Sequence, residues 1–171
     1  MENNAPPVAF HFESPPHLII IEARFYADIA DMQLAGVRAV LDRVHATSEI
    51  VQVPGALEIP AAIAYAIKAL DFDPLRRRAD GYIALGCVLK GGTHHDEIVG
   101  TESAHGLQHL AMLHSLAIGN GILTCNDRKQ AIERADPAKM DRGGKAAEAA
   151  LRMIELKHHF RLSPKRRWVA K

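Results

Sequence analysis

Short apolar runs alternate with longer segments of helical spacing along most of this chain. Residues 17–23, rich in isoleucine, are typical of a buried strand, and the apolar residues of 28–46 recur every three or four positions, as in an amphipathic helix. Further strands are predicted over 48–53, 81–89 and 116–124, and further helices over 57–70, 93–114, 127–135 and 141–159. Because strands and helices alternate with short connections, the sequence predicts an α/β fold, a four-stranded parallel sheet with helices on both faces.

The chain has 171 residues, the usual size of one domain, and shows no internal repeat or linker. We expect one α/β domain over residues 17–160. Residues 1–16 are polar and rich in proline, and we expect a flexible tail that takes any order from another subunit. Residues 161–171 form a basic tail, which is more typical of a solvated end than of a nucleic-acid contact.

Composition excludes several classes of protein. A net charge of +1 gives no reason to expect a nucleic-acid partner. No apolar run approaches the ~20 residues of a membrane helix, and the first residues lack the pattern of a secretory signal. Cys87 and Cys125 are far apart in the sequence and require no disulfide, so a reducing cytoplasm is the simplest location.

Ligands of open parallel sheets lie beyond the carboxyl ends of the strands. That rule selects residues 24–26, 54–58, 90–97 and 124–127, each of which follows a predicted strand and precedes a predicted helix. We expect these four segments to line one face of the molecule.

The third segment has the most informative composition. Gly91 and Gly92 permit a tight turn, and Thr93 is predicted to cap the following helix with Asp96 three residues later. Free backbone N–H groups at such a helix start bind anions, and Lys90 adds positive charge, so a phosphate is the expected guest. A plain glycine-rich turn is the simpler interpretation when this segment is taken alone.

His94 and His95 open the same predicted helix, where an imidazole can transfer protons near neutral pH, and Glu97 or Glu58 can orient it. Two solvated histidines are the simpler interpretation. His105 and His109 share a helix face, but no third ligand stands at metal-site spacing, so we expect no metal.

Two further side chains are candidates for ligand contacts. Phe25 follows the first strand, where it can stack on a planar ring, although a core position is the default for phenylalanine. Arg134 and Arg142 bracket a turn, and either can hold a phosphate with two hydrogen bonds, although isolated arginines are usually solvated.

Taken together, the strand-end segments resemble the lumazine synthase family from about Leu18 to Leu156. The resemblance rests on five pieces in the right order: ARFY at 23–26, VPGALEIP at 53–60, GCVLKGGTHH at 86–95, GNGILT at 119–124 and QAIER at 130–134. It implies a flavodoxin-like three-layer sandwich. It also implies a transferase without a cofactor.

The reaction implied by the resemblance is the condensation of 5-amino-6-(D-ribitylamino)uracil with 3,4-dihydroxy-2-butanone 4-phosphate. The amine attacks the ketone to give an imine, phosphate leaves, and ring closure with loss of water gives 6,7-dimethyl-8-ribityllumazine. This is the penultimate step of riboflavin biosynthesis.

The resemblance also assigns roles to individual residues. His95, rather than His94, falls on the catalytic position as the proton-transfer residue, and Phe25 stacks on the pyrimidine ring. Gly92 and Thr93 receive the phosphate, which Arg134 pairs with. The ribityl and uracil site is lined by Ala56, Leu57, Glu58, Cys87, Val88 and Leu89.

In this family a neighbouring subunit completes the pocket, so the segments around Asn120 and Arg134 are expected to face another chain's His95. The implied assembly is a homopentamer, and some members form a hollow capsid of about 60 subunits. The N-terminal tail is then expected to add to a neighbour's sheet.

Some positions depart from the family's commonest pattern, with Asp96 in place of an aromatic residue, Asn120 in place of a phenylalanine and Arg142 in place of a lysine. These departures motivate an alternative: a catalytically weak or inactive paralogue that binds a flavin or lumazine, or serves as a shell protein. A generic phospho-ligand binder, suggested by Gly91 and Gly92 alone, is a third hypothesis.

Overall fold

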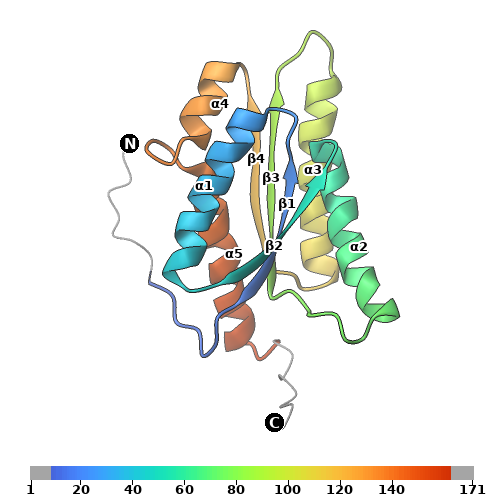
Figure 1. Ribbon diagram of the computed structural model, residues 1–171. Helices are drawn as coiled ribbons and strands as arrows, with labels where there is room; N and C mark the ends of the chain where they lie inside the picture. The colour runs from blue at the N-terminus through green and yellow to red at the C-terminus, as the bar shows by residue number, and fades with distance from the viewer. Residues whose placement is uncertain (1–8, 163–171) are drawn as a thin grey trace.

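The computed structural model describes residues 9–162, and its centre is a sheet of four parallel strands. The strands are β1 (His17–Ala23), β2 (Thr47–Val53), β3 (Gly81–Leu89) and β4 (Ile118–Cys125). Their order across the sheet is β2-β1-β3-β4, and each neighbouring pair is parallel (Figure 1). The predicted four-stranded parallel sheet is confirmed.

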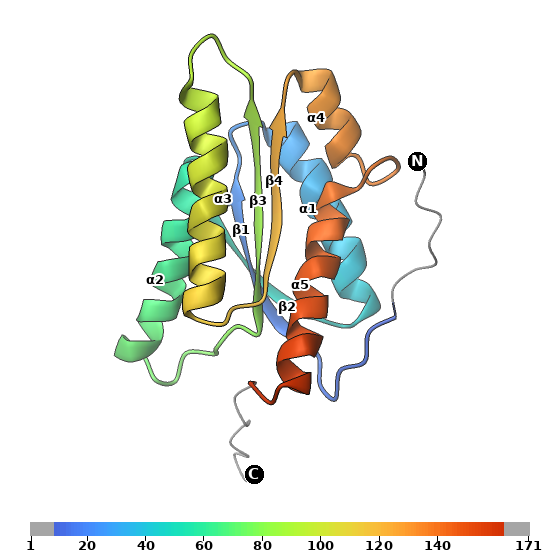
Figure 2. The ribbon, with the colours of Figure 1, turned by 180° about the vertical axis from the view of Figure 1, so that it is seen from behind.

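Helices cover both faces of the sheet. The helices α1 (Ala27–Arg43), α4 (Arg128–Ala135) and α5 (Arg142–His159) lie on one face, and α2 (Ile59–Phe72) and α3 (His95–Leu113) lie on the other (Figures 1 and 2). A short 3₁₀ turn, η1 (Ala56–Glu58), precedes α2. This arrangement is the predicted flavodoxin-like three-layer sandwich.

Side-chain caps fix the starts of the last two helices. Asp127 accepts a hydrogen bond from the backbone N–H of Gln130 at 2.8 Å, and Asp141 accepts one from Gly144 at 2.9 Å. Each bond satisfies a backbone donor that the first turn of a helix leaves free.

The predicted Thr93 cap with Asp96 as its partner is wrong. Helix α3 begins at His95, and His94 in the cap position makes no capping bond through its side chain. The Asp96 carboxylate instead accepts a hydrogen bond from the backbone N–H of Gly91 at 3.2 Å. That bond closes the glycine-rich loop on itself, so the loop extends two residues beyond the predicted helix start.

Two other predicted boundaries shift for local backbone reasons. The first helix ends at Arg43 because His45 has a left-handed conformation, with φ 53°. Strand β4 begins at Ile118 rather than Leu116, because the backbone N–H of Leu116 still bonds to Ala111 of helix α3.

The sheet separates two apolar cores. On one face, Leu18, Ile20 and Leu85 pack with α1 and α5, and on the other Ile19, Ile21 and Ala84 pack with α2 and α3. Strand β1 is therefore buried on both faces, as a central parallel strand should be. Strand β2 is an edge strand, and Thr47–Ile50 are exposed.

Part of the predicted N-terminal tail lies against α5. Phe10 and Phe12 are half-buried and stack at 6.1 Å between ring centres, while the Arg152 guanidinium lies 4.8 Å from the centre of the Phe10 ring. The rest of that tail, residues 1–8, and most of the predicted basic tail, residues 163–171, lie outside the described residues. Within residues 9–162, no helix has the length and apolarity that crossing a membrane requires.

Candidate active site

The end of β1 and the predicted segment 54–58 meet at Gly86 of β3. A Cβ added to Gly86 would lie 3.5 Å from that of Ala56 and 3.6 Å from that of Ala23. The end of β1 and the η1 turn after β2 therefore pack against β3 at van der Waals distance. A methyl group at this position would make ordinary van der Waals contacts with both residues.

The η1 turn presents its three residues differently. Ala56 is buried, at 5% exposed, where it packs on Gly86, whereas Leu57 is 42% exposed and Glu58 is exposed. The Glu58 carboxylate lies beside Gly55, since a Cβ at Gly55 would be 2.9 Å from its Oε2. The Leu57 and Glu58 side chains are thus accessible to a ligand, while the buried Ala56 anchors the turn that carries them.

A shallow hollow of about 450 Å³ lies between the ends of β3 and β4 and the first turns of α3. Its walls come from the predicted third and fourth segments and from helix α3. They are formed by Val88, Lys90, Asp96, Glu97, Gly100, Thr101, Thr124, Cys125 and Asn126.

Strand alternation divides the three predicted residues of β3 between the two faces. Val88 packs with the α2 and α3 layer and lines the hollow. Cys87 and Leu89 pack on the opposite side, beside Ile29 and Leu123. Of these three side chains, only that of Val88 reaches the hollow within one chain.

Gly100 is a wall residue that the sequence analysis did not single out. A Cβ there would lie 2.8 Å from the methyl group of Thr124, so the glycine brings α3 close to β4. The sequence did contain a signal for this contact. A glycine inside a helical pattern weakens the helix, so its presence usually indicates close packing against another element.

The two histidines at the start of α3 have different surroundings. Nδ1 of His94 lies 3.3 Å from Oε2 of Glu97, one turn along the helix. The His95 side chain is exposed and has no hydrogen-bond partner among residues 9–162. Glu97 therefore orients His94, and the His95 imidazole is free to reach a ligand.

The glycine-rich loop leaves one side open. The backbone N–H of Gly91 is occupied by Asp96, but a Cβ at Gly92 would meet no atom within 4 Å. The Thr93 hydroxyl approaches the backbone N–H of His95 at 3.4 Å. An anion can approach at Gly92 and Thr93, with the negative charge of Asp96 on the other side of the loop.

Phe25 stands out from the surface after β1. It is 75% exposed and contacts the Tyr26 ring edge to face, with 5.0 Å between ring centres. The core position that is the default for a phenylalanine is therefore wrong here. A flat apolar ring held in water at a strand end is available to stack on a heterocycle.

A buried carboxylate supports the loop that carries Phe25. Glu22, 1% exposed, accepts hydrogen bonds from Arg24 at 3.3 Å and from Gln52 at 3.0 Å, and Arg24 also bonds Asp31 of α1 at 2.6 Å. The Asp31 bond is the largest cause of a raised Arg24 pKa. These hydrogen bonds connect β1, β2 and α1. No residue spacing in the sequence predicted them.

Arg134 and His95 lie on opposite faces of the sheet, on α4 and α3 (Figures 1 and 2). The half-buried Arg134 donates to the carbonyl of Gln130 at 3.4 Å. Asn120 is exposed in the middle of edge strand β4, where its Oδ1 accepts the N–H of Ile122 at 2.9 Å. The chain thus does not gather His95, Arg134 and Asn120 into one of its own pockets.

Neither cysteine is poised as a nucleophile. Burial raises the pKa of the Cys87 thiol to about 12, and burial also raises the pKa of Cys125. Both stay protonated at neutral pH, and the thiolate is the reactive form.

Among residues 9–162, no three His, Cys, Asp or Glu side chains stand together in a way that would hold a metal ion. Nδ1 of His105 lies 3.7 Å from Oε1 of Glu102 on the exposed side of α3.

Comparison with known proteins places the chain in a family. A family model described as 6,7-dimethyl-8-ribityllumazine synthase matches residues 15–158. The 6,7-dimethyl-8-ribityllumazine synthase 1 of Rhizobium meliloti is 53% identical over 146 residues, which are 85% of this chain and 94% of the relative. The synthases of Agrobacterium fabrum and Sphingopyxis alaskensis are each 51% identical over 144 residues, 84% of this chain and 96% of each relative. The chain belongs to the 6,7-dimethyl-8-ribityllumazine synthase family.

Proposed function

We propose that the carboxyl edge of the sheet carries out the family's reaction, with His95 as the proton-transfer residue. The chain is a transferase of riboflavin biosynthesis that condenses 5-amino-6-(D-ribitylamino)uracil with 3,4-dihydroxy-2-butanone 4-phosphate. The relatives' names support this reaction and give no support to a non-catalytic paralogue. The observation that carries the site assignment is the free His95 imidazole beside an open glycine-rich loop.

The ribityl-aminouracil is assigned to the side of the site nearer β1 and β2. The exposed Phe25 ring stacks on the pyrimidine, and Leu57 and Glu58 face the ligand from the rigid η1 turn. Ala56 and Val88 close the apolar side. Cys87 and Leu89 are then limited to backbone contacts, because their side chains lie in the core beneath α1 and α4.

The keto-phosphate is assigned to the glycine-rich loop. Gly92 and Thr93 offer backbone N–H groups to the phosphate at the start of α3, where the helix dipole favours an anion. Arg134 of a neighbouring subunit adds a cation that can make two parallel hydrogen bonds. Holding the two reactants in contact supplies much of the rate gain, because it replaces a bimolecular encounter.

His95 then moves protons during the three bond changes. The amine attacks the ketone and loss of water gives the imine, phosphate leaves by elimination, and ring closure with loss of water gives the lumazine. Each change needs a proton taken up or released near neutral pH, which suits an imidazole. His94 is held by Glu97 and is assigned no proton transfer.

The family's assembly is oligomeric, and a ring of five with sites at subunit interfaces is the form we propose. The α2 and α3 layer exposes large apolar side chains that a monomer would leave in water: Tyr65, Phe72, Ile98, Met112 and Leu113. Such a patch is typical of a protein interface. An interface site also explains why Arg134 and Asn120 lie away from His95 within one chain.

Two finer points belong to the same proposal. Stacking of rings into a capsid of about 60 subunits is compatible with the exposed edge strand β2, to which a neighbour's N-terminal segment can add. A reducing cytoplasm suits two cysteines that are both free thiols.

The test is to mix the purified oligomer with both substrates, follow lumazine absorbance, and repeat the assay with Arg134→Ala. Wild type should form product, and Arg134→Ala should raise KM for the keto-phosphate by at least tenfold while KM for the aminouracil changes little. Arg38→Ala, an exposed arginine on α1, is the matched control. A loss confined to the aminouracil would contradict the phosphate assignment, and no product from assembled wild type would contradict the function.

A further inference from the structure

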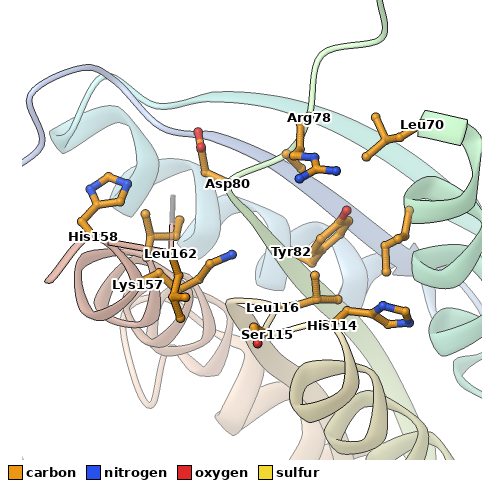
Figure 3. A pocket seen from close by; sticks show the side chains of 13 residues that line it. Leu70, Arg78, Asp80, Tyr82, His114, Ser115, Leu116, Lys157, His158 and Leu162 are labelled. Carbon is orange, nitrogen blue, oxygen red and sulfur yellow. The ribbon is translucent and has the colours of Figure 1, made fainter. Parts of the chain in front are cut away.

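A second cavity lies at the other end of the sheet from the candidate active site. It has a volume of about 250 Å³ and opens between the start of β3 and the last turns of α3 and α5. Figure 3 shows Lys157 reaching into it from α5 and Tyr82 from β3, with Arg78 and Asp80 on the segment that leads into β3. The lumazine synthase site uses none of these residues.

Lys157 is a cation that the Asp80 carboxylate attracts from across this cavity without forming an ion pair. Its side chain is half-buried, and among residues 9–162 it makes no hydrogen bond and no ion pair within 4.0 Å. Burial lowers the pKa of the Lys157 ammonium. A charge partly removed from water is costly unless a ligand or a counter-ion pairs with it.

Tyr82 brings a hydroxyl to the same space. The residue is only 4% exposed, yet its hydroxyl has no hydrogen-bond partner among the described residues. The hydroxyl oxygen is not fully buried, so it is open to the cavity as a hydrogen-bond donor. Burial raises the pKa of the Tyr82 phenol, so the hydroxyl is present as a donor at neutral pH.

The lining groups give the cavity a net positive character. Arg78 adds a second cation to the lining. Asp80 is the one carboxylate among the lining residues, and its Oδ2 already accepts the backbone N–H of His17 at 2.7 Å. Donors therefore outnumber acceptors around the empty space.

The remaining wall is apolar and is formed by Ile67, Leu70, Leu116, Ile154 and Leu162. The volume lies below the ~300–1,000 Å³ of pockets for drug-sized ligands. We propose that this cavity binds a small amphipathic oxyanion, a phosphate or carboxylate group on a short apolar body. The oxyanion pairs with Lys157 and Arg78 and accepts from the Tyr82 hydroxyl, while the apolar body lies on the wall.

The test is calorimetric titration of the intact oligomer with phenyl phosphate, with benzoate, and with neutral phenol. Each titration is repeated in an Arg134→Ala background, which weakens phosphate binding at the candidate active site. Lys157→Met should lower the affinity for both anions by at least tenfold, and Lys157→Arg should retain it within about threefold. Lys145→Met, an exposed lysine on the same helix, should leave the affinity unchanged.

Three results would overturn the proposal: equal affinity in wild type and Lys157→Met, loss of all anion binding in Arg134→Ala, or phenol binding as tightly as phenyl phosphate. Equal affinity in Lys157→Met, or tight phenol binding, would show that binding does not need the Lys157 cation. Loss of all anion binding in Arg134→Ala would show that the anion binds at the candidate active site. Tighter binding of phenyl phosphate than of benzoate, or the reverse, identifies which oxyanion the site prefers. Failure here leaves the synthase function untouched, because product formation is measured separately.

Discussion

At the scale of single residues, burial and pairing distinguish side chains that look equivalent in the sequence. His94 and His95 are neighbours, but only His94 pairs with the Glu97 carboxylate. Cys87, Val88 and Leu89 are consecutive, but only the middle one faces the hollow. Lys157 and Lys145 share a helix, but Lys157 is half-buried and Lys145 is exposed.

Lys157 also gives a prediction on stability. Its pKa is lowered in the folded state, chiefly by burial, from the ordinary value of 10.5, so the unfolded chain binds the proton more tightly. The ammonium therefore destabilises the fold at all pH values below its folded pKa, and stability rises with pH between that value and 10.5.

Lys157→Met should accordingly raise Tm at pH 7, and its advantage over wild type should shrink as pH rises towards 10.5. Thermal unfolding of both proteins at several pH values, without added anions, checks this. A variant that is less stable than wild type at pH 7 would show that the ammonium has a stabilising partner.

At the scale of secondary-structure elements, glycines set how closely the layers approach the sheet. A Cβ at Gly119 of β4 would overlap the backbone carbonyl of Ala146 on α5. Gly100 likewise lets α3 approach β4 at the carboxyl edge, where an added Cβ would lie 2.8 Å from the Thr124 methyl group. The position of the site thus depends on glycines that hold no ligand.

Gly119→Ala should lower the free energy of unfolding by about 1–3 kcal/mol, because α5 must shift to admit the methyl group. Denaturant titration measures the loss. Gly92→Ala is the control for stability alone, since its added Cβ meets nothing within 4 Å. Equal stability of wild type and Gly119→Ala would mean that the β4–α5 contact is less tight than the structure has it.

The sequence was sufficient to predict the helices and strands, but it did not predict the side-chain hydrogen bonds. Strand β1 and strand β3 have the predicted bounds, because a short apolar run beside a helical pattern leaves few alternatives. The bond of Asp96 to Gly91, and the Glu22 network with Arg24 and Gln52, depend on how loops meet in space. Spacing along one chain does not contain that information, which is why the Thr93 cap was wrong.

At the scale of the whole molecule, the residues proposed for the site are divided between the two faces of the sheet. His95 begins α3 on one face and Arg134 ends its helix on the other (Figures 1 and 2). In the proposed function a second copy of the chain joins them, and the exposed apolar residues of α2 and α3 are the surface proposed for it. One domain over residues 17–160 stays a prediction of the sequence.

Mixing two inactive variants tests this division. Oligomers of His95→Ala alone and of Arg134→Ala alone should both be slow. After unfolding and refolding together in equal amounts, about one quarter of the sites should pair an intact His95 with a neighbour's intact Arg134, and activity should return in that proportion. If mixing restores nothing although mixed oligomers form, both residues act within one chain and the interface assignment is wrong.

The most direct measurement compares His95→Ala with its neighbour His94→Ala in the same lumazine assay. His95→Ala should lower kcat by about 10²–10⁴-fold, the usual contribution of a positioned proton-transfer group, with its oligomer intact by light scattering. His94→Ala should stay within about threefold of wild type, because His94 pairs with Glu97 and is assigned no proton transfer. Equal effects of the two substitutions, or full activity in His95→Ala, would contradict the assignment of His95 as the residue that moves the protons.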